Sequence, residues 1–207
     1  MNEKFFQLPI EKQQRIINAG YRVFSQNSYK KSPVSEIAAE AGISKSLLFH
    51  YFKNKKELYL FLWDNCAKMT VQTLQEYGCY EKEDFFEIMY SGLRAKVQMM
   101  HKYPEMGRFA LKAYYEKDPE VYSEIQASIE EHSAFTENVK KFKLEPKQFL
   151  PGIDMEMMYN NMLLASEGYL WKIIQQGNIT AERIEKIEQD FYKMIEFWKK
   201  IYTRKKG

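Results

Sequence analysis

The last part of the chain carries apolar residues at helical spacing, and this pattern limits the fold more than any other feature of the sequence. Steps of three and four residues separate Ile184, Ile187, Phe191, Met194, Trp198 and Ile201. Charged residues occupy the other sides, as in an amphipathic helix that packs along its whole length. Similar stripes recur along the chain, whereas runs of alternating β-branched residues and hairpin turn signals do not. The sequence therefore predicts an all-α fold.

Proline, glycine and capping residues divide this pattern into separate helices. We expect a first helix over residues 9–26 and a second that is capped by Ser32, with Pro33 in the first helical position. Ser44 is expected to cap a third helix of about eight residues. A fourth begins near Lys55, and the later helices are predicted near residues 82–102, 105–116, 118–142, 152–176 and 180–203. The residues before the first helix and the basic end TRKKG are expected to be frayed.

The composition is that of an ordinary soluble protein, with 45% hydrophobic and 29% charged residues in a chain of 207. The longest uncharged apolar stretch, Met157 to Ser166, is about half of the ~20 residues that span a bilayer. The first residues lack the apolar run of a signal peptide, so we expect a cytoplasmic protein without a membrane partner. Cys66 and Cys79 are then expected to be thiols. Two cysteines and three scattered histidines offer no zinc spacing, and no cofactor is expected.

Charge is distributed unevenly along the chain. The first 60 residues contain ten Lys and Arg against five Asp and Glu, a net charge of +5, whereas the whole chain carries +3. A basic N-terminal segment beside a nearly neutral remainder is the electrostatic footprint of a polyanionic partner such as nucleic acid. The same balance also occurs on solvated surfaces that bind nothing.

The short helix predicted after Ser44 divides its side chains between two faces. Leu48 and Phe52 are four residues apart and point inward. The outward face and its two borders are formed by Lys45, Ser46, Leu47, Phe49, His50 and Tyr51. A helix of two turns is barely stable by itself, so the preceding helix must support it across the tight turn at Gly42. This is the layout of a helix-turn-helix, whose second helix enters the major groove of DNA.

The segment IINAGYRVFSQNSYKKSPVSEIAAEAGISKSLLFHYFKNKKELY, residues 16–59, resembles the N-terminal DNA-binding domain of TetR/AcrR-type transcriptional regulators. The matching positions are Ile16, Ile17, Ala19, Phe24, Ile37, Ala38, Ala41, Gly42, Ser44, Lys45, Leu48, His50, Tyr51, Phe52, Lys53, Lys55 and Leu58. The resemblance implies an N-terminal three-helix helix-turn-helix domain over residues 1–54 and a connector helix over 55–77. It also implies a C-terminal effector-binding and dimerisation bundle over 78–207, with a ligand pocket and a dimer interface.

The chain departs from the family pattern at a few positions. The family usually has Gly where Ser28 stands, so Asn27 or Ser28 is expected to make that turn at some strain. Ser46, Leu47 and Phe49 replace residues that are common in the family, and Leu47 and Phe49 remove two hydroxyl groups from the DNA-facing side. These changes affect which operator is read, and an apolar Leu47 can pack on a thymine methyl group.

The resemblance and the helical wheel together select the candidate DNA contacts. Base edges are assigned to Lys45, Ser46, Leu47 and His50, with Phe49 on the same face, and phosphates to Ser32, Tyr51, Lys53 and Lys55. Lys55 lies near the start of the fourth helix, where the helix dipole also favours an anion. Two alternatives stay open: Tyr51 can be a core aromatic residue, and His50 can be an exposed residue that contacts nothing.

The C-terminal region is rich in aromatic residues and methionine, which fill ordinary cores and also line pockets for flat apolar ligands. The resemblance favours a pocket, for which the candidates are Tyr90, Met99, Phe109, Tyr114, Tyr122, Met162, Glu167 and Trp171. Glu167 lies in an apolar stretch, where a carboxylate is costly unless it is paired or hydrogen-bonded. An ion pair with Lys172 and a contact with the effector are both open explanations.

The last two predicted helices carry the expected dimer interface. In the resembling family these helices pair with their counterparts across a two-fold axis, so we expect a homodimer with an interface from about residues 152–203. The resemblance implies a repressor that binds a palindromic double-stranded operator and is released by a small-molecule effector. An activator, or a helical module that contacts protein, is the alternative. We find no nucleophile with an adjacent base, no glycine-rich phosphate loop and no paired carboxylates, so an enzyme is not expected.

Overall fold

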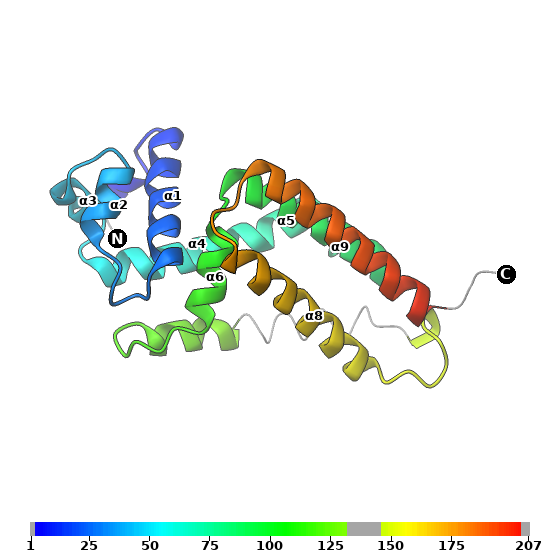
Figure 1. Ribbon diagram of the computed structural model, residues 1–207. Helices are drawn as coiled ribbons and strands as arrows, with labels where there is room; N and C mark the ends of the chain where they lie inside the picture. The colour runs from blue at the N-terminus through cyan, green and yellow to red at the C-terminus, as the bar shows by residue number, and fades with distance from the viewer. Residues whose placement is uncertain (1–2, 132–145, 204–207) are drawn as a thin grey trace. The chain divides into compact units, whose positions relative to one another are not determined.

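The computed structural model describes residues 3–131 and 146–203, and no strand occurs in these ranges (Figure 1). The elements are η1 (Glu3–Phe5), α1 (Ile10–Gln26), α2 (Val34–Glu40), α3 (Lys45–Tyr51), α4 (Lys55–Glu76), α5 (Phe85–Lys102), α6 (Met106–Tyr114), η2 (Pro146–Gln148), α8 (Met155–Gln175) and α9 (Ala181–Tyr202). Residues 122–131 are also helical. The all-α prediction is confirmed. The remainder of the helix predicted at 118–142, and the last four residues of the TRKKG end, lie outside the described residues.

The chain forms two compact units that are discontinuous in sequence. The N-terminal unit contains the described residues up to Met69 and those from Lys102 to 131. The C-terminal unit contains Thr70–His101 and the described residues from 146 onward. These limits differ from the sequence-based ones at residues 54 and 77. The difference arises because α6 and residues 122–131 group with the helix-turn-helix. Helix α4 contributes residues to both units.

The core of the N-terminal unit is built on one face of α1. Ile16, Ala19, Val23 and Phe24 are buried, at the helical spacing that the sequence predicted. Gly20 lies on the same face, and a Cβ atom there would be only 2.6 Å from Cδ1 of Leu62 in α4. The missing side chain therefore permits α1 and α4 to approach closely.

Helix α2 ends in a glycine turn that leads directly into α3. Gly42 has a positive φ of 66°. Its backbone N–H donates to the carbonyl oxygen of Ala39, and the N–H of Ile43 donates to that of Ala38, each at 3.0 Å. These two bonds form a Schellman motif, which satisfies the last carbonyls of a helix. Ser44 then caps α3 as predicted, because its Oγ accepts a hydrogen bond of 3.1 Å from the N–H of Leu47.

Two local predictions between α1 and α2 are wrong. Ser32 does not cap α2, since Pro33 occupies the N-cap position in an extended conformation and the helix starts at Val34. The Ser32 hydroxyl instead donates to the carbonyl oxygen of Ser28 at 2.9 Å, which closes the loop on itself. The turn after α1 is also unstrained, because Asn27 is extended at φ −121° and no described residue other than glycine has a positive φ.

The chain before α1 is ordered from Glu3 onward, contrary to the prediction of a frayed start. Glu3–Phe5 forms a 3-10 turn in which the N–H of Phe6 donates to the carbonyl oxygen of Glu3 at 3.0 Å. The side-chain amide of Gln13 in α1 donates to the carbonyl oxygens of Phe6 at 3.2 Å and Leu8 at 2.8 Å. Helix α1 therefore binds the segment that precedes it.

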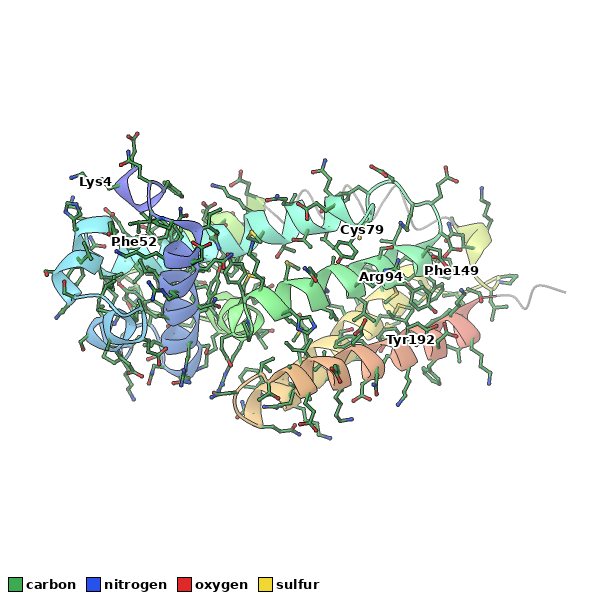
Figure 2. The ribbon with its side chains drawn as sticks, turned by 90° about the horizontal axis from the view of Figure 1, so that it is seen from above. Lys4, Phe52, Cys79, Arg94, Phe149 and Tyr192 are labelled. Carbon is green, nitrogen blue, oxygen red and sulfur yellow. The ribbon has the colours of Figure 1, made fainter. Side chains whose placement is uncertain are left out.

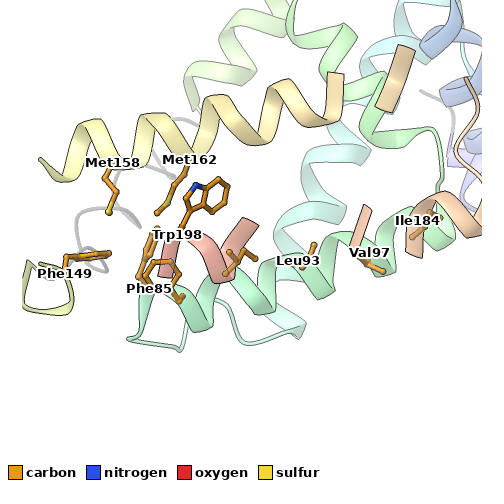
Figure 3. Close-up of a cluster of buried hydrophobic side chains, with 10 residues drawn as sticks. Phe85, Leu93, Val97, Phe149, Met158, Met162, Ile184 and Trp198 are labelled. Carbon is orange, nitrogen blue, oxygen red and sulfur yellow. The ribbon is translucent and has the colours of Figure 1, made fainter. Parts of the chain in front are cut away.

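The C-terminal unit packs α5, α8 and α9 around one apolar cluster (Figure 3). Its buried members are Phe85, Phe86, Leu93, Val97, Phe149, Met158, Met162, Ile184, Ile195 and Trp198. Helices α5 and α9 lie side by side, and Tyr90 of α5 donates a hydrogen bond to Glu196 and packs on the Tyr192 ring of α9. Most of the stripe predicted on α9 faces this cluster, although Ile201 at its end is 40% exposed.

No helix among the described residues combines the length and the apolar run of a membrane span. Cys66 and Cys79 are both buried and are not joined in a disulfide.

Candidate nucleic-acid interface

Helix α3 is held in place by a completely buried inner face. Leu48 and Phe52 have no exposed surface, which confirms that they point inward. Tyr51 is also buried, at 5% exposure, and its ring lies against those of Phe5 and His50. Of the two interpretations of Tyr51, the structure shows the core position.

The opposite face of α3 projects into solvent. Lys45, Ser46 and His50 are exposed, whereas Leu47 and Phe49 are partly buried. The Lys45 ammonium lies 5.8 Å from the centre of the Phe49 ring. The hydroxyl groups of Ser44 and Ser46 are 3.0 Å apart and share a hydrogen bond at the start of the helix. The exposed face thus presents one cation, one hydroxyl group and one imidazole over two turns.

The four phosphate candidates have different environments. Ser32 is buried and its hydroxyl group is used within the loop, and Tyr51 belongs to the core. Lys53 is exposed just before α4. Lys55 is half-buried, and its ammonium donates to the carbonyl oxygen of Lys30 at 3.0 Å. Burial lowers the pKa of Lys55 from its ordinary value, while the nearby carboxylates of Glu120 and Asp118 oppose this change.

The start of α4 has a side-chain cap that the sequence analysis missed. The Oδ1 atom of Asn54 accepts a hydrogen bond of 2.8 Å from the N–H of Glu57. The Glu57 carboxylate accepts in return from the N–H of Lys53 at 3.3 Å. An Asn followed three residues later by Glu is the sequence signature of such a cap, and it was present in NKKE. The backbone N–H groups of Lys55 and Lys56 also lie in the first turn of α4, where the helix dipole favours an anion.

The short helix α3, the glycine turn before it and the basic residues after it lie in a segment that matches a known family. Residues 16–61 match the family model described as "Bacterial regulatory proteins, tetR family". The chain is 32% identical over 65 residues to the fatty acid metabolism regulator protein of Bacillus subtilis (strain 168), covering 31% of this chain and 34% of that protein. It is 28% identical over 142 residues to the HTH-type transcriptional regulator RutR of Escherichia coli (strain K12), covering 65% of each chain. The alignments therefore span about a third and about two thirds of these relatives.

The fold agrees over a longer range than the sequence. A crystal structure of a TetR family transcriptional regulator from Chloroflexus aurantiacus superposes with a TM-score of 0.68 and covers 99% of both chains at 22% identity. Residues 16–61 therefore match the tetR family in sequence, and the rest of the chain shares the fold of these regulators. The family model covers α1 from Ile16, helices α2 and α3 with the turn between them, and the start of α4.

The ligand candidates divide between the two units. Phe109, Tyr114 and Tyr122 belong to the N-terminal unit, where Phe109 packs in the core against Tyr21 and Tyr59. Tyr114 and Tyr122 are exposed. The five candidates in the C-terminal unit are Tyr90, Met99, Met162, Glu167 and Trp171.

Those five candidates also differ in exposure. Met99 and Met162 are buried, and Trp171 is 47% exposed. Tyr90 and Glu167 are partly buried. Among the described residues, Glu167 and Lys172 do not form an ion pair. No group of three metal-ligating side chains occurs in the part of the chain that the structure describes.

Proposed function

We propose that this chain is a DNA-binding transcriptional regulator, specifically a repressor that binds a palindromic operator as a homodimer. One observation carries the proposal: the inner face of α3 is completely buried, while Lys45, Ser46 and His50 project from its outer face. A two-turn helix that is held rigidly by its neighbours, with polar groups outward, is suited to read base edges in a major groove. The match of residues 16–61 to the tetR family supports this reading.

The proposed contacts follow from the exposure of each side chain. Lys45, Ser46, Leu47 and His50 are assigned to base edges, with Phe49 packing beside them. Lys53 and Lys55, together with the first N–H groups of α4, are assigned to phosphates. Ser32 and Tyr51 are buried, so any phosphate contact from these residues is limited to their hydroxyl groups.

A stripe of exposed apolar residues on α8 supports a homodimer. Met157, Leu164 and Trp171 are spaced by seven residues and are 60%, 65% and 47% exposed. On α9, Phe197 and Ile201 are also exposed, at 59% and 40%. Large apolar side chains at regular helical spacing indicate an interaction surface. A second copy of the chain is the proposed partner, because a dimer presents two recognition helices to the two halves of a palindrome. Light scattering that gave a monomer at micromolar concentration would contradict this.

We propose that the effector is small and largely apolar and binds within the C-terminal bundle. The methionine and aromatic side chains around Tyr90, Met99 and Met162 form adaptable surroundings for such a ligand. The Bacillus subtilis relative is named a fatty acid metabolism regulator, which agrees with an apolar effector. Trp171 shares the exposed stripe of α8 and is better explained by the dimer. A Glu167→Gln variant with unchanged effector affinity would exclude a role for Glu167.

The decisive experiment selects DNA fragments that the purified protein retains from a random pool. A palindromic consensus is the expected result, and equal retention of all duplexes at low salt would overturn the proposal. Lys45→Ala should weaken binding to the selected sequence and reduce its preference over random duplex by about fivefold or more, as for the loss of one base contact. Lys68→Ala, which removes an equal charge from an exposed site on α4, is the matched control.

A further inference from the structure

The turn Glu3–Phe5 contains one completely buried side chain. Phe5 has no exposed surface, whereas its neighbour Phe6 is 56% exposed and Ile10, at the start of α1, is 68% exposed. The carbonyl oxygen of Phe5 accepts a hydrogen bond of 3.2 Å from the N–H of Leu8, and Gln13 ties the following residues to α1. The ring of Phe5 is thus inserted into the N-terminal unit by a segment that is itself bound in place.

The surroundings of Phe5 are the last residues of α3 and the first turns of α4. Its ring centre lies 5.0 Å from that of Phe52 and 6.1 Å from that of Tyr51. On the other side it lies 5.2 Å from the ring of Phe61 in α4. Figure 2 labels Phe52 in the N-terminal unit. Edge-to-face and tilted ring pairs at these distances are favourable beyond the apolar surface that they bury. Phe5 therefore joins the end of the recognition helix to the helix that follows.

A continuous row of rings leads from this turn to the exposed face of α3. Phe5 contacts Tyr51, and the Tyr51 ring lies edge-to-face with the His50 ring at 5.8 Å. His50 is one of the residues assigned to base edges. The start of α3 is fixed by the Ser44 cap and the Gly42 turn, but these bonds do not reach its last turn. Because so short a helix has little stability of its own, its end needs support from elsewhere.

We infer that Phe5 is a positioning residue for DNA reading: by packing on Tyr51 and Phe52 it fixes the last turn of α3 and thereby the place of His50. This inference rests on the proposed function, since it explains how a sequence-reading face is kept in one orientation. The phosphate contact assigned to Lys55 is held by groups outside α3, the carbonyl oxygen of Lys30 and the ring of Tyr29. Loss of the Phe5 ring is therefore expected to reduce the affinity for the operator more than the affinity for random duplex DNA.

The test compares Phe5→Ala with Ile10→Ala in the full-length protein. Phe5→Ala should weaken binding to the selected operator by about tenfold or more, comparable with the misplacement of one base contact. Binding to random duplex at low salt, and the slope of affinity against salt concentration, should stay as in the unaltered protein. Ile10→Ala should behave like the unaltered protein in both assays. Phe5→Leu, which restores most of the buried volume, should recover most of the lost affinity.

A second readout uses no DNA, so it separates this inference from the proposed function. The chain has only three histidines, and the ring proton resonances of His50 can be followed by NMR in the free protein. Phe5→Ala should shift the His50 resonances, while Ile10→Ala should leave them in place. If Phe5→Ala fails to fold, the same comparison is made with Phe5→Leu, for which a smaller shift in the same direction is expected.

Three results would overturn the inference. The first is that Phe5→Ala binds the operator as tightly as the unaltered protein. The second is that Phe5→Ala loses affinity for operator and random duplex equally. The third is that Phe5→Ala leaves the His50 resonances unchanged. If the unaltered protein itself prefers no sequence, the proposed function fails, and the NMR comparison alone then decides whether Phe5 positions His50.

Discussion

The ammonium group of Lys55 lies 4.9 Å from the centre of the Tyr29 ring. The Tyr29 ring packs against the rings of Phe24 and Tyr59, and the backbone N–H of Tyr29 donates to a carboxylate oxygen of Glu116 at 2.8 Å. The loop after α1 therefore places the charge of Lys55 through a cation–π contact and the bond to the Lys30 carbonyl. An ammonium group has three donors, so Lys55 retains the capacity to bind a phosphate oxygen from this fixed position.

Replacing Lys55 with methionine keeps the stem over Tyr29 and removes the charge. We expect the affinity for operator and for random duplex to fall by the same factor. The slope of log affinity against log salt concentration should decrease by about one, because one phosphate contact is lost. Fluorescence anisotropy titrations over a range of salt concentrations measure both quantities.

The matched control for this experiment is Lys68→Met, since Lys68 is 75% exposed and pairs with Asp64 on the same helix. It should leave the salt slope unchanged. A change in sequence preference in Lys55→Met, with an unchanged slope, would show that Lys55 acts on the reading face and not on a phosphate.

The features that the sequence predicted correctly depend on residues that are close together in the chain. Leu48 and Phe52 were placed inside by their spacing alone, and both are completely buried. The Gly42 turn and the Ser44 cap were predicted because a positive φ and an N-cap require particular residue types at one position. These are local rules, so one sequence is enough to apply them.

The features that the sequence did not predict depend on contacts between distant residues. Nothing near Phe5 indicates that it packs on Phe52, and nothing near Tyr29 indicates that it binds Glu116. Ser32 is an exception, because it was assigned as a cap from its residue type and its hydroxyl group instead donates to Ser28 within the same loop. The pocket candidates stay a prediction for the same reason: aromatic residues look alike in sequence whether they line a pocket or, like Phe109, pack in a core.

Gly20 is a position where local propensity and packing make opposite predictions. In an isolated helix, Gly→Ala is stabilising by about 1 kcal/mol. In this protein a Cβ atom would lie 2.6 Å from Cδ1 of Leu62, whose side chain is completely buried and cannot move aside freely. We expect Gly20→Ala to lower the free energy of unfolding by about 1–3 kcal/mol, the usual effect of overpacking.

Chemical denaturation of Gly20→Ala measures this effect, and Gly107→Ala in α6 is the matched control, because nothing lies within 4 Å of the position of its Cβ. The control should be neutral or stabilising. A double variant with Leu62→Val should recover part of the loss. Stabilisation by Gly20→Ala would show that α1 and α4 separate easily.

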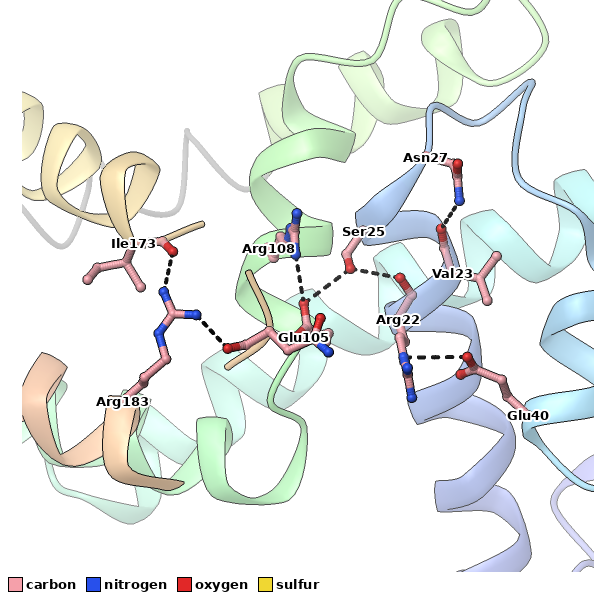
Figure 4. Close-up of polar contacts among 10 residues, drawn as sticks. Arg22, Val23, Ser25, Asn27, Glu40, Glu105, Arg108, Ile173 and Arg183 are labelled. Atoms are coloured by element: carbon pink, nitrogen blue, oxygen red, sulfur yellow. Dashed lines mark hydrogen bonds and ion pairs between the residues drawn. The ribbon is translucent and has the colours of Figure 1, made fainter. Parts of the chain in front are cut away.

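Arg183 closes the turn between α8 and α9 (Figure 4). Its guanidinium group donates to the carbonyl oxygens of Ile173 at 2.6 Å and Asn178 at 2.5 Å. Ile173 lies in the last turn of α8, where its carbonyl oxygen also accepts from the N–H of Gln176 at 3.1 Å and a cation is favoured by the helix dipole. The planar group reaches both acceptors at once, which the single ammonium group of lysine does poorly.

We therefore expect Arg183→Lys to lower the free energy of unfolding by about 1.5 kcal/mol, within the range for hydrogen bonds to a charged group. Because α8 and α9 carry the proposed dimer surface, the dimer should also dissociate at a higher protein concentration. Urea denaturation and sedimentation measure these two changes. Arg94→Lys on α5, whose guanidinium group donates to Ser91 of the same helix, should change neither. An effect of equal size in the control would show that the loss is not specific to the turn.

Asp190 makes the stability of the same pair of helices dependent on pH. Hydrogen bonds from the Lys186 ammonium at 3.0 Å and the Tyr169 hydroxyl at 2.8 Å lower the pKa of the Asp190 carboxyl group from its ordinary value. A pKa that is lower in the folded state means that the ionised group stabilises the fold above the pKa of the unfolded chain, about 3.9. This contribution is lost as the pH falls through the pKa of the folded state.

Asp190→Asn should accordingly be less stable than the unaltered protein by about 1 kcal/mol at neutral pH, since Lys186 is largely exposed and its pair is screened. The difference should stay constant from neutral pH down to about pH 5 and should shrink steadily below about pH 4. Urea denaturation at a series of pH values measures it, and Asp64→Asn, which breaks an exposed pair with Lys68, is the control. A difference that persisted unchanged to pH 3 would mean that Asp190 stabilises the fold through its shape and neutral hydrogen bonds, and not through its charge.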